Sequence, residues 1–186
     1  IKKILIKKFI EGTQLIEQND NLETFFKIKI NKNNSSIIFF DQSSLKFIEY
    51  FDFGTNIILQ DIQKVCSINK EVINKILDEK VGRNLKENEV FSENCFPEGR
   101  FKKIEKKLIK DIAKARIEEI IKIIFNKNIN IFSFKKKNCK IYLGIDDKQI
   151  IANFKDDFFS SLNEKRYFEI SLQEDFFNEE TTMRAA

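Results

Sequence analysis

Apolar and polar residues alternate in the first third of the chain, which is the pattern of half-buried β-strands. The clearest run is Phe26, Ile28 and Ile30, with Lys27 and Lys29 between them. Short polar stretches separate these runs, so we predict antiparallel hairpins. The predicted strands cover residues 1–6, 25–30, 36–40 and 45–51, with a short helix over 9–17.

From residue 56 the apolar positions recur with the period of helices. Two short helices are predicted over 57–65 and 72–77. The polar stretch 80–100 contains the only proline and predicts a loop. The strongest pattern lies over 101–125, where two adjacent apolar rows predict a long helix that is buried along much of its length.

The rest of the chain continues to alternate between strands and helices. Polar residues 126–130 are predicted to end the long helix. The later predicted elements are a buried strand over 140–145, a helix over 148–162 and a strand over 167–172. The succession of elements predicts an α/β fold.

The composition of this 186-residue chain excludes several classes of chemistry. There is no histidine, so no imidazole base, Ser/His/Asp triad or histidine-ligated zinc can form within it. The three cysteines are far apart, which argues against a disulfide framework and favours a reducing cytoplasm. No apolar run reaches the roughly 18 residues of a membrane span. Because the sequence starts with Ile1, we take it to be a fragment.

Charge is unevenly distributed around a net value of +4. Residues 101–116 carry seven basic and two acidic side chains, whereas 145–186 carry ten acidic and five basic ones. The basic stretch predicts either a surface for an acidic partner or an ordinary solvated helix face. Most phenylalanines lie in apolar surroundings, as at residues 37–40, and are predicted to be core rather than a nucleic-acid surface.

The order of elements and four short motifs resemble the second half of the FtsA family of bacterial actin-like cell-division proteins. The matching segments are residues 28–40 at the phosphate-binding hairpin, 53–62 at a G-G-x-x-x-T-x-D-I motif, 116–120 (RIEEI) on the long helix and 142–146 at the last strand. The resemblance spans about residues 1–172. It implies an α/β actin-like ATPase (ribonuclease H-like) half, with a mixed sheet, helices and a small α-rich subdomain.

The resemblance also implies a division into parts. Residues 1–55 and 106–172 would form the actin-like core subdomain, and residues 56–105 a small inserted helical subdomain. Residues 173–186 lie beyond the resemblance, and their acidic composition predicts a flexible tail.

Several positions of the implied nucleotide cleft depart from the family pattern. The family's acid aligns with Lys29, which cannot ligate Mg²⁺, and its Glu and Lys on a helix align with Asn74 and Leu77. We therefore expect no catalytic residue, no metal site, and either no cofactor or weak binding of ATP and Mg²⁺. The degenerate nucleotide cleft is predicted at Asn31, Lys32, Asn33, Asn34, Ser35, Gly54, Thr55, Asn74, Gly144 and Asp146.

The function implied by the resemblance is that of a cell-division adaptor. Such an adaptor would bind the C-terminal peptide of FtsZ, associate with itself into filaments, and reach the membrane through a segment absent from this sequence. It would lie in the cytoplasm, at the inner face of the cell membrane at the division site, and would bind no nucleic acid.

Two alternatives compete with this interpretation. One is an active actin-like ATPase, for which Asp61 is the candidate acid. Otherwise Asp61 is an acid on the surface of the helix over 57–65, early enough to interact favourably with the helix dipole. The other is a basic nucleic-acid-binding domain. The adjacent acids Glu118-Glu119, Asp146-Asp147 and Asp156-Asp157 are interpreted as exposed charges, because neighbours on a helix point about 100° apart.

Overall fold

A computed structural model describes residues 24–42, 44–79, 89–132, 139–163 and 168–172. The elements predicted over 1–6 and 9–17, the first part of the predicted loop and the acidic tail lie outside these residues. The other predicted strands and helices are present, with differences at both ends of the long helix.

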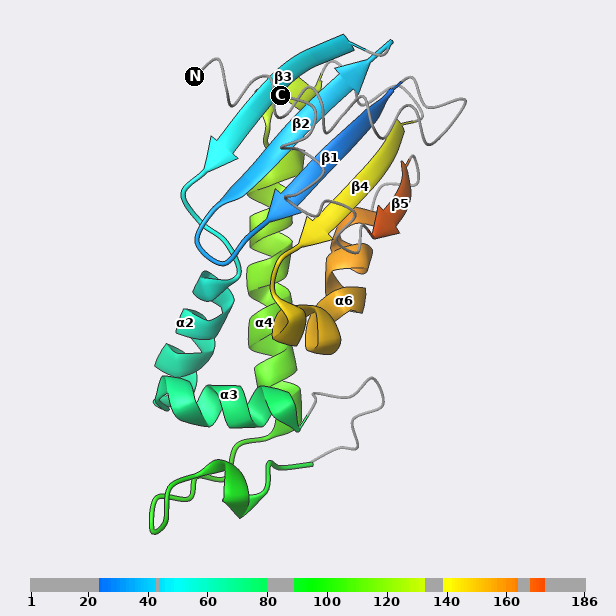
Figure 1. Cartoon of the computed structure of the whole chain (residues 1–186). Helices are drawn as coiled ribbons and strands as arrows, with labels where there is room; N and C mark the ends of the chain where they lie inside the picture. The colour runs from blue at the N-terminus through cyan, green and yellow to red at the C-terminus, as the bar shows by residue number, and fades with distance from the viewer. Residues whose placement is uncertain (1–23, 43, 80–88, 133–138, 164–167, 173–186) are drawn as a thin grey trace, which may run out of the picture.

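Five strands form one mixed sheet in the order β3–β2–β1–β4–β5 (Figure 1). The predicted hairpins are confirmed, because β1, β2 and β3 pair antiparallel. β4 pairs parallel to β1, and β5 pairs parallel to β4. The strands are β1 (Phe25–Ile30), β2 (Ser35–Asp41), β3 (Ser44–Phe51), β4 (Cys139–Ile145) and β5 (Phe168–Leu172).

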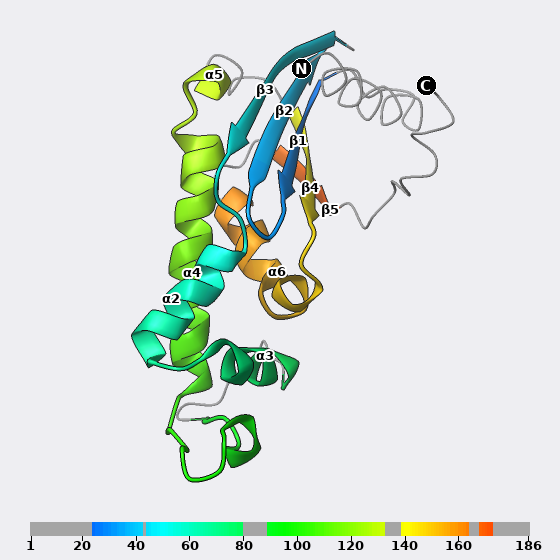
Figure 2. The same ribbon diagram turned by 60° about the vertical axis from the view of Figure 1, so that its left-hand side comes forward.

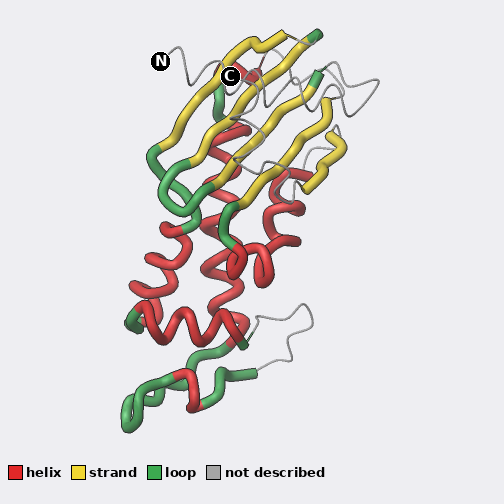
Figure 3. The backbone as a smooth tube through the Cα atoms, viewed as in Figure 1, coloured by secondary structure: helices red, strands yellow, loops and turns green. Residues whose placement is uncertain are grey.

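The helices gather against one face of the sheet, as Figures 2 and 3 show. The central α4 lies between α2 and α6 and packs against both. The helices are α2 (Asn56–Cys66), α3 (Lys70–Asp78), α4 (Lys106–Ile121), α5 (Ile129–Phe132) and α6 (Lys148–Asn163).

The turn between α2 and α3 follows from two polar residues. Ser67 has φ 50° and ψ 50°, a left-handed conformation that ends α2. Asn69 caps α3, because its side-chain oxygen accepts a hydrogen bond from the Val72 N–H at 2.9 Å.

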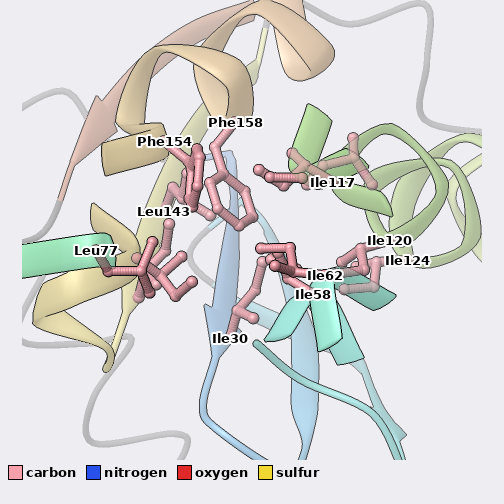
Figure 4. Packing of buried hydrophobic residues seen from close by; sticks show 14 of the residues in the cluster. Ile30, Ile58, Ile62, Leu77, Ile117, Ile120, Ile124, Leu143, Phe154 and Phe158 are labelled. Atoms are coloured by element: carbon pink, nitrogen blue, oxygen red, sulfur yellow. The ribbon is translucent and has the colours of Figure 1, made fainter. Parts of the chain in front are cut away.

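The core lies between the sheet and the helices. The alternation in β1 points Phe26, Ile28 and Ile30 at the helices, where they join one large hydrophobic cluster. Figure 4 shows Ile30 beside Ile58 of α2, with side chains of α4 and α6 closing the cluster. Phenylalanines on both faces of the sheet are buried, as predicted for this residue type. The same cluster includes side chains of α2 and α3, and the division into subdomains stays a prediction.

The long helix begins later than its apolar rows predict. α4 starts at Lys106, because the segment before it is extended and forms a bridge between Val90 and Glu105. Ile104 reaches the core from this extended segment, and its carbonyl oxygen accepts the Phe91 N–H at 3.2 Å. Leu108, expected in an apolar row, is exposed. The buried face of α4 is therefore narrower than predicted.

The end of the long helix also differs in detail. A π-helical turn, Lys122–Asn126, continues α4 to the predicted limit. The short helix α5 then begins at Ile129, within the polar stretch that was predicted only to end the long helix. Asn128 explains this, since its buried side chain donates hydrogen bonds to Glu49 of β3 and to the Ile124 carbonyl oxygen. The polar side chain thus ties the end of the helix to the sheet.

Adjacent acids in α6 do not share one environment. Asp156 is exposed, but Asp157 is only 8% exposed and faces α4, which contradicts its interpretation as a surface charge. Burial raises the pKa of the Asp157 carboxyl, although Lys110 and Lys114 of α4 act in the opposite direction. Glu118 and Asp156 add to the increase.

We expect Asp157→Asn to increase the free energy of unfolding at pH 7 by about 1 kcal/mol. The folded-state pKa lies above the unfolded value, so the acid causes no loss of stability below its unfolded pKa. The loss develops as the pH rises through the folded pKa. Urea unfolding at pH 7 and near pH 3.5 should show the variant's advantage only at pH 7. Asp156→Asn is the exposed control, and an equal gain there would contradict the prediction.

Candidate functional site

Two parallel strands end side by side at one edge of the sheet. The chain leaves β1 through the turn Asn31–Asn34 and leaves β4 through Asp146 and Asp147. The Asp146 N–H donates to the Ile30 carbonyl oxygen at 3.0 Å, which holds the two exits together. In open α/β sheets, ligands bind outside the carboxyl ends of parallel strands. We call this region the hairpin corner: Lys29, residues 31–34, residues 54–56, Asp146 and Asp147.

The turn of the hairpin is closed by asparagine rather than glycine. The Asn31 N–H donates to the Asn34 carbonyl oxygen at 2.8 Å, and the Asn31 side-chain amide donates to Asn34 Oδ1 at 2.5 Å. Among the described residues, the non-glycine positions with positive φ are Gln42 and Ser67. The turn therefore forms without the left-handed conformations that glycine permits.

The start of α2 is joined directly to this turn. The Thr55 and Asn56 N–H groups donate to the carbonyl oxygens of Asn31 and Lys32 at 3.0 and 2.9 Å. The Asn56 side-chain amide donates to Asn33 Oδ1 at 2.5 Å. The N–H groups at a helix start are the usual anion-binding groups. Here the first two are already used by the hairpin.

Gly54 is required by this close contact. A Cβ at this position would lie 2.0 Å from the Asn31 carbonyl oxygen and 2.8 Å from backbone atoms of Lys32. Glycine therefore lets two backbones touch. Gly144 in β4 differs, because a Cβ there would meet only the Ile28 carbonyl oxygen, at 3.9 Å.

Asp147 joins the starts of α2 and α6. Its carboxylate is buried and accepts the Thr55 hydroxyl at 3.1 Å and the Ile150 N–H at 3.3 Å. The second contact is a helix N-cap. The interpretation of Asp147 as an exposed charge was wrong. An acid directly before a predicted helix is the sequence signal for this role.

The two half-exposed charges of the corner neutralise each other. Lys29 Nζ lies 3.2 Å from Asp146 Oδ2, and each side chain is about 40% exposed. Lys29 aligns with the family's acid, and Asp146 with the second glycine of its Gly-Gly pair. Mg²⁺ prefers several oxygen ligands in octahedral geometry. A lysine ammonium paired with the exposed carboxylate, beside a hydrogen-bonded Asp147, does not fit that requirement.

The remaining predicted cleft residues lie in different surroundings. Ser35 is buried in β2 and donates its hydroxyl to the Phe53 carbonyl oxygen at 2.7 Å. Gly144 lies in β4 opposite Lys29 of β1. Asn74 is half-buried in α3, which lies beyond α2 from the turn in Figure 1. Leu77 belongs to the hydrophobic core, as Figure 4 shows, and has no polar group to offer a ligand.

Asp61 is engaged away from the corner. It forms an ion pair with Arg116 of α4, and Arg116 also contacts Glu119 at 2.6 Å. Hydrogen bonding to Asp61 raises the pKa of the Arg116 guanidinium. Asp61 lies in the middle of α2, so the expected role at the helix start was wrong; it links α2 to α4.

Metal-binding clusters and membrane-spanning helices are both absent from the described residues. No group of three or more histidine, cysteine, aspartate or glutamate side chains gathers there in a form that could hold a metal ion. None of the described helices is long and apolar enough to cross a membrane.

Known proteins resemble the chain in structure rather than in sequence. No protein-family model matches it, and no curated protein matches its sequence. MreB 5 of Spiroplasma citri, solved bound to AMPPNP, matches with a TM-score of 0.56 and 12% identity, over 96% of this chain and 59% of that one. A Bacillus thuringiensis ParM hybrid protein, solved with ADP, matches with a TM-score of 0.50 and 18% identity, over 82% of this chain and 21% of that one.

The fold is therefore part of the actin-like ATPase fold, with a mixed sheet and helices, which confirms the predicted fold class. The chain spans less than two thirds of the length of either solved structure. Membership of the FtsA family in particular stays a prediction.

Proposed function

We propose that this chain is part of an actin-like scaffold protein, an adaptor of the FtsA type, whose nucleotide cleft no longer supports ATP turnover. The observation that carries the proposal is the Lys29–Asp146 ion pair at 3.2 Å. An actin-like ATPase needs an acid near this position to organise its metal and water. The Lys29 ammonium at this position repels Mg²⁺, and Asp146 of the hairpin corner is its counter-ion.

The backbone of the corner supports the same proposal. The Thr55 and Asn56 N–H groups donate to the hairpin carbonyls, so they are not available to phosphate oxygens. Asp147 is buried and spends both carboxylate oxygens on Thr55 and Ile150. The solved MreB and ParM structures carry AMPPNP and ADP. In this corner several backbone and side-chain groups of residues 31–34, Thr55, Asn56 and Asp147 bond to one another instead.

The adaptor role would consist of binding and assembly. The partners we propose are the C-terminal peptide of FtsZ, other copies of the chain in a filament, and the membrane through a segment outside this sequence. The site of action would be the cytoplasmic face of the membrane at the division site. No nucleic acid is part of this proposal, since the phenylalanines of β1 and β2 are buried rather than exposed for base stacking.

Isothermal titration calorimetry of the full-length protein with Mg²⁺-ATP should detect no binding tighter than about 1 mM. A micromolar Kd would contradict the loss of the nucleotide cleft. The role as an adaptor is tested separately by fluorescence anisotropy with a labelled FtsZ C-terminal peptide. We expect equal binding with and without ATP, and failure to bind would contradict the adaptor role while leaving the cleft argument intact.

A further inference from the structure

Exposed apolar side chains gather around the junction of α2 and α4. The large exposed hydrophobic residues of the described chain include Val65, Phe101 and Leu108, which are 60%, 45% and 42% exposed. Val65 lies in the last turn of α2, Leu108 in the first turn of α4, and Phe101 in the segment before α4.

Two contacts between neighbouring residues place these three side chains on one side of the molecule. Asp61 and Arg116 pair across α2 and α4, which run in opposite directions. Val65 follows Asp61 by one helical turn, and Leu108 precedes Arg116 by about two turns. Because the helices are antiparallel, both residues lie on the same side of this ion pair. Lys102 Nζ donates to the Ser67 carbonyl oxygen at 2.6 Å, so the segment containing Phe101 lies beside the same end of α2. We call Val65, Phe101 and Leu108 the apolar patch.

The apolar patch has a basic border. Exposed lysines follow it on all three segments: Lys64, Lys102, Lys103 and Lys107. Within residues 101–111, the exposed acids are Glu105 and Asp111. A shallow hollow of about 510 Å³ opens at the end of α2 on a neighbouring face, lined by Gln60, Gln63, Lys64, Ser67, Ile68 and Asn69. Such a surface fits an acidic segment that carries large apolar side chains.

The chain itself contains a segment of that composition. Residues 174–180 read EDFFNEE, with two phenylalanines between four acids. Phe176 follows β5 by four residues, an extended reach of about 14 Å. The apolar patch lies on the α2 side of α4, whereas β5 lies on the α6 side (Figures 1 and 2). Docking on the patch of its own molecule would require the segment to pass α4, across two helix spacings of 8–10 Å, about 16–20 Å in all. A second copy presents the same patch without this path, so it is the occupant to which the proposal commits.

We propose that residues 174–180 of one copy dock on the apolar patch of a second copy. Phe176 and Phe177 would cover Val65, Phe101 and Leu108, and the acids would face the lysine border. The contact joins two different surfaces, so it adds one copy after another rather than closing a two-fold dimer. It rests on the self-association that the proposed function includes and assigns a surface to it. It does not involve the hairpin corner, so its failure would leave the argument about the nucleotide cleft intact.

The test is sedimentation velocity of the full chain over a concentration series at 0.1 and 0.5 M NaCl. We expect the average mass to rise with concentration at low salt and to fall toward the monomer at high salt, because the lysine border is exposed. A segment variant, Phe176→Ser with Phe177→Ser, should stay monomeric. A patch variant, Val65→Ser with Leu108→Ser, should stay monomeric as well.

Mixing the two variants distinguishes this contact from other modes of association. The patch variant keeps an intact segment and the segment variant keeps an intact patch, so the mixture should form dimers and nothing larger. Ile129→Ser is the matched control, since Ile129 is 83% exposed in α5 and should not affect association. A wild-type chain that stays monomeric, variants that associate like the wild type, or a mixture without dimers would each overturn the proposal.

A second measurement avoids dependence on the folding of the variants. A fluorescent peptide of residues 172–182 is titrated into the unmodified chain, beside a peptide with serine in place of both phenylalanines. We expect the first peptide to bind at least about tenfold more tightly than the second, as for aromatic anchors at interfaces. Equal binding of the two peptides, or no binding of either, would overturn the proposal.

Discussion

Gly54→Ala is expected to lower the free energy of unfolding by about 3 kcal/mol or more, enough to unfold much of the protein. The added methyl group would lie 2.0 Å from the Asn31 carbonyl oxygen. It can be accommodated only if the start of α2 moves away from the hairpin. That movement would break the Thr55 and Asn56 hydrogen bonds to the turn as well.

Gly144→Ala provides the matched control for this change. The same methyl group in β4 would make one ordinary contact, with the Ile28 carbonyl oxygen at 3.9 Å. We expect a change of less than about 1 kcal/mol. Urea unfolding monitored by far-ultraviolet circular dichroism compares the two variants. Similar losses of unfolding free energy in both variants would show that the close contact with Asn31 is not the reason why position 54 needs glycine.

Asp147→Ala is expected to cost about 2–3 kcal/mol of stability, from a charge-assisted buried hydrogen bond together with a helix cap. The substitution leaves the Thr55 hydroxyl and the Ile150 N–H without their carboxylate acceptor. Thermal unfolding should show the loss as a lower Tm. Hydrogen exchange should locate it in the first turn of α6.

Asp146→Ala separates the effect of Asp147 from that of its neighbour. Asp146 is exposed and pairs with the half-exposed Lys29, and such surface ion pairs contribute about 0–1 kcal/mol. We therefore expect a small change at Asp146. If both substitutions cost the same, the buried link between α2 and α6 is not the source of the stability.

Periodicity predicted most of the fold because the core follows local rules. The alternation in β1 and the four-residue rows of α4 both describe side chains that meet the same core. Periodicity failed where a tertiary contact decided the backbone. Ile104 fits the helical row of α4, yet its carbonyl oxygen bonds to the Phe91 N–H, and this holds it in an extended segment.

The candidate site was harder to predict for a related reason. A motif comparison aligns Asn31 and Lys29 with family positions, but it says nothing about how side chains pair. The Lys29–Asp146 contact depends on the parallel register of β1 and β4, which no local pattern encodes. Asp147 and Asp157 were missed because adjacent acids were treated alike. In α6, helical geometry turns Asp156 outward and Asp157 inward. Asp147 precedes α6 and turns inward because it caps the helix.

The parallel pairing of β1 with β4 also sets the order in which the molecule can fold. Phe25 pairs with Lys140, so more than one hundred residues separate the two partners. During synthesis the β1–β2–β3 meander can form early. The other edge of β1 stays unpaired until the ribosome has released β4. An open edge of a hydrophobic strand is a template for unwanted pairing. Non-local pairing also slows folding. We therefore expect a truncated chain that ends before residue 139 to aggregate, and the complete sheet to assemble late and slowly.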